Sequence, residues 1–78
     1  MTNYQASTMD IQSQIAVFRR LSNHIANQTG YKAQVSAAGV RIEGYVLRMT
    51  PDYFNTPFGL PQQVREAVKE FNEMLGEF

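Results

Sequence analysis

The sequence predicts an α+β protein, with an antiparallel hairpin of two or three strands packed against two helices in the order α-β-β-α. Apolar residues recur at helical spacing towards both ends of the chain, and polar and apolar residues alternate along two short runs between them. With 78 residues, the chain is expected to form a single domain over residues 1–78. Such a short chain buries only about 60% of its unfolded surface, so we expect a homodimer to support the small core.

The first helix is predicted over residues 8–28. Ser7 followed by Asp10 resembles a capping box, and Gly30 is suited to end the helix. Residues 1–7 before it are expected to form a flexible N-terminus. The helix has one apolar stripe, made by Ile11, Ile15, Phe18, Leu21 and Ile25.

A β-hairpin is predicted from two alternating runs, residues 31–37 and residues 40–46, which a turn ending at Gly39 joins. The register that keeps apolar side chains on one face places Val35 opposite Ile42.

Beyond Gly44 the apolar face of the second strand changes sides, because Tyr45, Leu47 and Met49 alternate out of phase with Ile42. Three interpretations fit: a bulge at the glycine, a turn there that begins a third strand, or a second chain that covers the extra face. The bulge and the turn are favoured because neither needs a partner.

All three prolines fall in residues 50–61, which are interpreted as a loop rich in proline and aromatic residues. Tyr53, Phe54 and Phe58 lie in this loop, and stiff segments present aromatic side chains at low entropic cost. We expect Phe58 to fold back and fill the end of the core, and Tyr53 and Phe54 to lie on the surface.

The second helix is predicted to begin at Pro61 and to end near Gly76. Its stripe consists of Val64, Ala67, Val68, Phe71 and Leu75. Together the elements predict a core of twelve residues. These are Ile11, Ile15, Phe18, Leu21, Ile25, Val35, Ile42, Val46, Val64, Val68, Phe71 and Leu75.

Composition excludes several classes of protein. The chain has no cysteine, which removes disulfide frameworks, thiolate nucleophiles and zinc ribbons, and no run of about 20 apolar residues that would span a membrane. We therefore expect a cytoplasmic protein. Seven basic and seven acidic residues balance overall, but residues 1–50 carry five basic and two acidic side chains and residues 51–78 the reverse. This asymmetry argues against a strongly basic nucleic-acid clamp.

Catalytic groups are scarce. His24 is the single histidine, and no carboxylate lies three or four positions away to orient it. Glu66, Glu70 and Glu73 share one side of the second predicted helix and are interpreted as a solvated acidic face. No enzymatic activity, cofactor or metal is expected.

The function expected from these patterns is that of a small regulator or inhibitor that binds another protein. Short, neutral, cysteine-free chains are common among inhibitors carried by phages and mobile elements. The expected partner-binding residues are Tyr53, Phe54, Phe58, Tyr45, Leu47, Met49, Arg19 and Arg20. A structural subunit of a larger assembly is a further alternative.

Nucleic-acid binding is another alternative, because sheet surfaces that bind RNA combine cations with aromatic rings. The outer face of the hairpin is expected to carry Lys32, Arg41 and Tyr45, with Arg48 adjacent. Glu43 interrupts this patch, so a protein partner is favoured.

Overall fold

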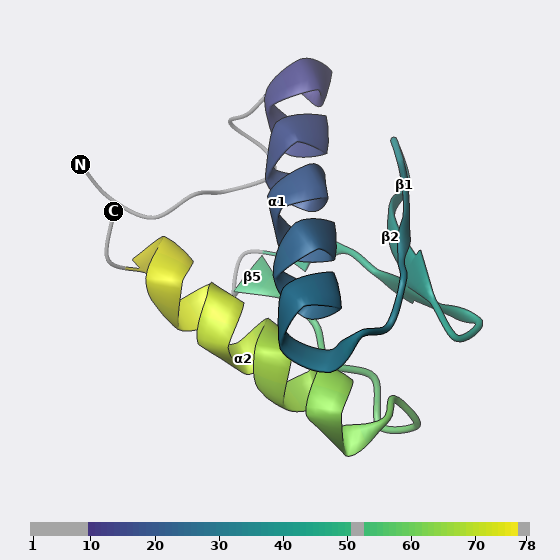
Figure 1. Ribbon diagram of the computed structural model, residues 1–78. Coiled ribbons are helices and arrows are strands. Elements are labelled where there is room, and N and C mark those ends of the chain that lie inside the picture. The colour runs from purple at the N-terminus through teal and green to yellow at the C-terminus, as the bar shows by residue number, and fades with distance from the viewer. Residues whose placement is uncertain (1–9, 51–52, 77–78) are drawn as a thin grey trace.

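The described residues form two helices and a three-stranded antiparallel sheet in the order α-β-β-β-α, which confirms the predicted α+β fold (Figure 1). This computed structural model describes residues 10–50 and 53–76. The predicted flexible segment, residues 1–7, lies outside the described residues. No helix in the described ranges is long and apolar enough to cross a membrane.

Helix α1 (Ile11–Thr29) begins three residues later than predicted because Asp10 itself is the N-cap. Its carboxylate accepts a hydrogen bond of 2.7 Å from the backbone N–H of Ser13. The helix ends where the N–H of Gly30 donates to the carbonyl of Ala26 at 2.9 Å. Ser7, the cap expected from the sequence, lies outside the described residues.

The first hairpin consists of β1 (Gln34–Ser36) and β2 (Gly39–Ile42), and its predicted register was wrong. Val35 lies opposite Val40 rather than Ile42. The hydroxyl of Ser36 accepts a hydrogen bond from the N–H of Ala38 at 3.2 Å, which sets the turn one residue earlier than expected. The resulting shift of the pairing by two residues leaves every side chain on its predicted face.

A turn at Glu43 and Gly44 reverses the chain into β3 (Tyr45–Leu47), which selects one of the three interpretations of this segment. Both turn residues have positive φ, 52° and 83°, as a type I′ hairpin turn requires. Because the chain reverses, Leu47 lies opposite Val40 and joins the same buried face. Neither a bulge nor a covering chain is needed to explain the change of phase.

The segment expected to be a loop, residues 50–61, instead contributes to a second, two-stranded sheet. Its strands are β4 (Met49–Thr50) and β5 (Tyr53–Phe54), with Met49 opposite Phe54. The side chain of Asn55 accepts a hydrogen bond of 2.8 Å from the N–H of Arg48, which extends the pairing by one residue on each side. The loop proper therefore begins only at residue 55.

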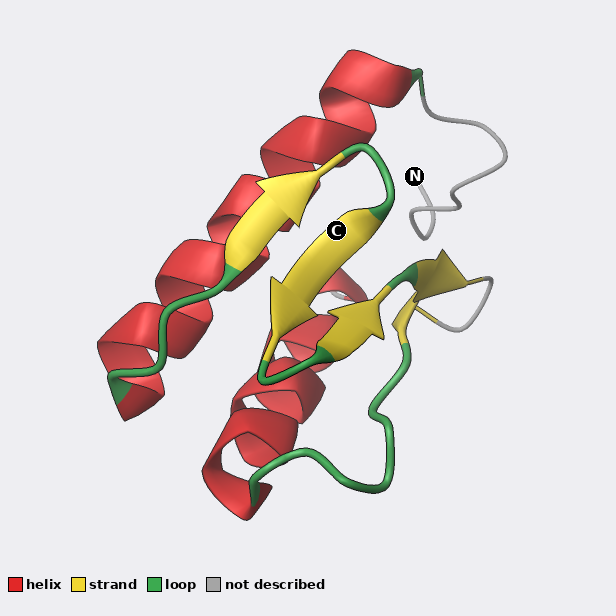
Figure 2. Cartoon of the chain, turned by 90° about the vertical axis from the view of Figure 1, so that its right-hand side faces the viewer, coloured by secondary structure: helices red, strands yellow, loops and turns green. Residues whose placement is uncertain are grey.

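Helix α2 (Gln62–Gly76) follows Pro61, as predicted, and the proline carbonyl accepts from the N–H of Arg65 at 3.0 Å. The helix packs against α1 and β5, whereas α1 contacts β1 and β2. Figure 2 shows the resulting layers, with the strands on one side of the helix pair.

The core lies between these layers. Eight of the twelve predicted core residues are fully buried, and Ile15 and Val35 are half-buried against the core. Val46 was wrongly predicted, because the turn at Gly44 places it opposite Arg41 on the outer face of the sheet. Ile11 was wrongly predicted: it is 64% exposed, because the first turn of α1 extends past the sheet (Figures 1 and 2). The buried residues that the sequence did not place in the core are Val17, Val40, Leu47, Met49, Phe54, Leu60 and Ala67.

Candidate functional site

Phe58 is the most exposed large apolar side chain of the described residues, at 93%. It lies at the tip of a turn that the N–H of Leu60 closes by donating to the carbonyl of Pro57 at 3.2 Å. The Leu60 side chain is buried in the core. The turn from Pro57 to Leu60, called the Phe58 turn below, thus holds an aromatic ring in solvent on a segment fixed to the core.

The ring of Tyr45 fixes the same turn from β3. It packs directly on the backbone of Gly59, so closely that a Cβ atom at Gly59 would lie 2.7 Å from Cζ of the tyrosine. Tyr45 is itself half-buried against the core. Two residues expected at the binding surface, Tyr45 and Phe58, therefore belong to one local unit, in which the tyrosine supports the turn that carries the phenylalanine.

The placement of the loop aromatics differs from the prediction. Phe54, expected at the surface, is 3% exposed, and its ring meets those of Phe18 and Phe71 at centroid distances of 5.8 and 6.1 Å. It fills the end of the core where Phe58 was expected. Tyr53 is half-buried, and its hydroxyl lies near Gly76 at the end of α2.

Two more expected contact residues are unavailable to a partner, since Leu47 and Met49 are buried in the core. Arg19 and Arg20 are exposed on α1, and the guanidinium of Arg20 lies over the ring of Phe71 at 5.9 Å from its centroid. This position places Arg20 at the junction of the two helices.

The outer face of the sheet lacks the aromatic ring expected for nucleic-acid binding. Tyr45 pairs with Ile42, whose side chain is buried, so the tyrosine projects to the inner face. Arg41 projects outward between Gln34 and Val46. Lys32 and Arg48 are exposed. The four residues of the alternative site therefore do not share one face.

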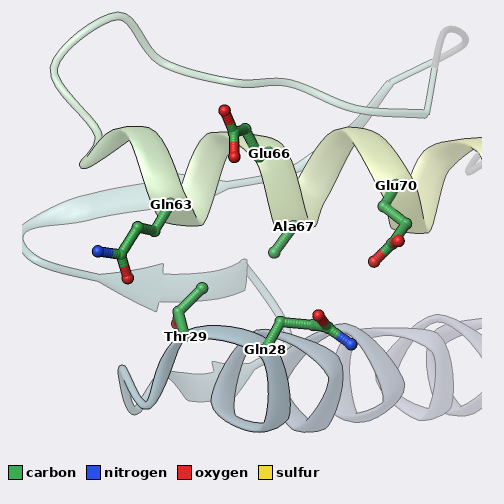
Figure 3. Close-up of a pocket in the computed structure, with 6 residues that line it drawn as sticks. All are labelled: Gln28, Thr29, Gln63, Glu66, Ala67 and Glu70. Atoms are coloured by element: carbon green, nitrogen blue, oxygen red, sulfur yellow. The ribbon is translucent and has the colours of Figure 1, made fainter.

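A surface pocket of about 330 Å³ lies between the end of α1 and the start of α2 (Figure 3). Its polar groups do not converge: Glu66 points away from α1, whereas Glu70 extends towards it. The hydroxyl of Thr29 is engaged by the backbone, donating to the carbonyl of Ile25 at 2.7 Å and accepting from the N–H of Tyr31 at 3.1 Å. These groups define a polar hollow without an acid–base pair.

His24 has a carboxylate neighbour that its own helix does not provide. Its Nε2 lies 2.9 Å from Oε1 of Glu70 on α2, and the imidazole is only 14% exposed, with its ring 5.7 Å from that of Phe71. The contact is short but poorly directed, since Nε2 is buried without a hydrogen bond of good geometry. It forms an ion pair only when the imidazole is protonated.

A second surface pocket, of about 390 Å³, lies beside the Phe58 turn. Its lining combines the loop with the outer side of α2: Thr56, Gln62, Arg65, Glu66 and Lys69. The sequence indicates only that Arg65 and Lys69 are neighbours on a helix. Their convergence with Thr56 depends on the path of the loop, which the sequence pattern does not contain.

Across residues 10–50 and 53–76, no three histidine, aspartate or glutamate side chains are grouped to hold a metal ion. Comparison with known proteins found no family model, curated protein or solved structure that matches the chain. The Phe58 turn and the adjoining pocket are together the candidate site that the geometry defines.

Proposed function

We propose that the chain is a small non-enzymatic regulator, of the inhibitor type, which acts by binding another protein through Phe58. The supporting observation is a phenylalanine that is 93% exposed on a turn whose next residues are held by the core and by Tyr45. The side chain adds nothing to the packing of its own fold. Burial against a partner would stabilise a complex by about 1.5–3 kcal/mol for such a side chain.

The rigidity of the turn favours binding as well. Binding segments that are disordered lose conformational entropy when they are ordered by a partner, and this loss weakens the complex. Pro57 restricts the backbone before Phe58, and the buried Leu60 holds the segment after it. The Phe58 turn is therefore ordered before the partner arrives, as is typical of aromatic residues that dominate interface energies.

Affinity capture with three versions of the chain tests the proposal. The wild type, Phe58→Ala and Ile11→Ala are immobilised separately and exposed to an extract of the native host, and bound proteins are identified by mass spectrometry. Ile11→Ala is a matched control because it removes an exposed apolar side chain from the first turn of α1, and the start of that helix lies far from the loop that leads into α2 (Figure 1).

We expect a protein that the wild type and Ile11→Ala retain and that Phe58→Ala loses. With the purified partner, the Phe58 substitution is expected to weaken binding by roughly 10–100-fold, which corresponds to about 1.4–2.8 kcal/mol. Equal capture by all three versions would contradict the proposed anchor. Self-association that Phe58→Ala abolishes would identify a second copy of this chain as the partner, which sedimentation at several concentrations detects.

A further inference from the structure

We propose that Arg65 and Lys69 form a binding site for a carboxylate group, and that the protein anchored by Phe58 carries this carboxylate. The second part of the proposal rests on the proposed function, and the first part stands without it. The partner surface would then have an apolar pocket for Phe58 and an aspartate, a glutamate or a C-terminal carboxylate beside it.

The first observation is the position of the two cations. Both line the pocket of about 390 Å³ beside the Phe58 turn, where Thr56 and Gln62 add a hydroxyl and an amide. Arg65 is half-buried and Lys69 exposed, so the pocket has one cation held against the protein and one in reach of solvent.

The second observation is that the described part of the chain provides no ion-pair partner for either cation. Among the residues that the structure describes, neither Arg65 nor Lys69 forms an ion pair, and the buried Nε of Arg65 has no hydrogen-bond acceptor. Glu66 is hydrogen-bonded instead to Gln62, at 3.1 Å. Like charges four residues apart on a helix repel each other, and a bound anion would relieve this repulsion.

The charge of the pocket selects the class of anion. Arg65 and Lys69 contribute two positive charges and Glu66 one negative charge, which leaves one positive charge to neutralise. A carboxylate carries one negative charge, whereas a phosphate group carries about −1.5 to −2 at pH 7 and would leave the pocket negative. The guanidinium of arginine also matches the two oxygens of a carboxylate, and a rotation of the Arg65 side chain would bring its Nε to them.

The chain connects this pocket to the proposed anchor. Thr56 directly precedes the Phe58 turn and Gln62 begins α2 just after it, so one short segment carries both features. A partner that buries Phe58 and extends along the start of α2 would place its neighbouring surface over Arg65 and Lys69. Acidic groups on that surface would be complementary to the two cations, which favours association and orients the complex.

An NMR titration tests the carboxylate site without the partner. The probe is the tripeptide acetyl-Ala-Glu-Ala-amide, which carries one carboxylate, compared at constant ionic strength with the matching glutamine peptide and with inorganic phosphate. We expect the glutamate peptide to shift the Arg65 side-chain Nε–Hε signal and the Thr56 amide signal in a saturable way. The glutamine peptide should leave both signals unchanged, and phosphate should bind more weakly than the glutamate peptide.

Substitutions locate the binding. Arg65→Gln and Lys69→Gln are each expected to weaken binding of the glutamate peptide at least tenfold, whereas Arg41→Gln, the same change on the outer face of the sheet, should not alter it. An unshifted Arg65 signal, equal weakening by Arg41→Gln, or tighter binding of phosphate would overturn the proposal. If Arg65→Gln does not fold, the exposed Lys69 provides the test.

The two proposals fail separately. Phe58→Ala should retain binding of the glutamate peptide while it loses the captured partner. Arg65→Gln and Lys69→Gln should reduce affinity for the same partner, and full affinity in both would overturn the second part of the inference alone. Loss of peptide binding with intact capture through Phe58 would leave the proposed function standing.

Discussion

Asn72 forms two hydrogen bonds with the backbone of Phe54, accepting from its N–H at 3.0 Å and donating to its carbonyl at 2.9 Å. One side-chain amide on α2 thus provides β5 with the donor and acceptor that another strand would otherwise supply. This pair of bonds holds Phe54 against the core. The loop that carries the exposed Phe58 follows directly after this strand.

Asn72→Ala is expected to destabilise the fold by about 1–3 kcal/mol, because it leaves a partly buried N–H and carbonyl without partners. Thermal and urea unfolding measure the loss. Asn27→Ala, which removes the same amide from an exposed position of α1, serves as the control and should change stability by less than about 0.5 kcal/mol. Similar stability of the two variants would contradict the role assigned to Asn72.

Two phenylalanines four residues apart are expected to differ sharply in their contribution to stability. Phe54→Ala removes a buried ring and should cost about 3–5 kcal/mol, whereas Phe58→Ala should change the free energy of unfolding by less than about 0.5 kcal/mol. Urea unfolding followed by circular dichroism measures both values. Phe54→Leu provides a milder variant if the alanine variant does not fold, and a large loss in Phe58→Ala would show that this ring packs in solution.

Gly59→Ala should disturb the support of the Phe58 turn by Tyr45. The added methyl group would overlap the tyrosine ring, and such overpacking costs about 1–3 kcal/mol. The same substitution in a Tyr45→Leu background should cost less, since the overlapping atoms are absent. A double-mutant cycle measures this coupling, and equal costs in both backgrounds would show that the two residues do not interact.

The turn between β2 and β3 offers a route to greater stability. Glu43 adopts a φ of 52°, which asparagine tolerates better than glutamate, so Glu43→Asn should stabilise the hairpin by about 0.5–1 kcal/mol. Gly44→Ala should have the opposite effect, by about 1–2 kcal/mol, because its φ of 83° disfavours a side chain even though the space around it is open. Melting temperatures that shift in the same direction for both variants would contradict this account.

The cap of α1 predicts a dependence of stability on pH. The hydrogen bond from the backbone of Ser13 lowers the pKa of Asp10 below its usual value of 3.8. A carboxyl group whose pKa is lower in the folded state stabilises the fold above its unfolded pKa, and that contribution is lost as the pH falls through the folded pKa. Unfolding of the wild type should therefore respond more steeply to acid below pH 3.8 than that of Asp10→Asn.

Melting temperatures of the wild type and Asp10→Asn, measured from pH 7 to pH 2.5, test this expectation. The difference between them should shrink towards the acid end, because a protonated Asp10 and an asparagine cap the helix similarly. Asn27→Ala on the exposed side of α1, which alters no titratable group, is the control, and its difference from the wild type should stay nearly constant. A constant difference for Asp10→Asn would contradict the assigned role of the cap.

Local periodicity by itself determined the two helices and the hairpin of this protein. A stripe such as that from Phe18 to Ile25 indicates which side of a helix is apolar, because successive residues of a helix are rotated by a fixed angle. The same pattern does not report how far the covering element extends, which is why Ile11 continues the stripe yet lies in solvent. The pattern also did not distinguish a turn at Gly44 from a bulge there or from a second chain that covers the strand.

Only the tertiary structure decided which residues form the candidate site. Nothing in the sequence near Phe54 or Phe58 distinguishes the buried ring from the exposed one, since the difference arises from hydrogen bonds to Asn72 on a distant helix. The contact between His24 and Glu70 likewise depends on how the helices cross. Such contacts join residues far apart in the chain, and the free energy that selects among them comes from packing the whole core, which no local pattern contains.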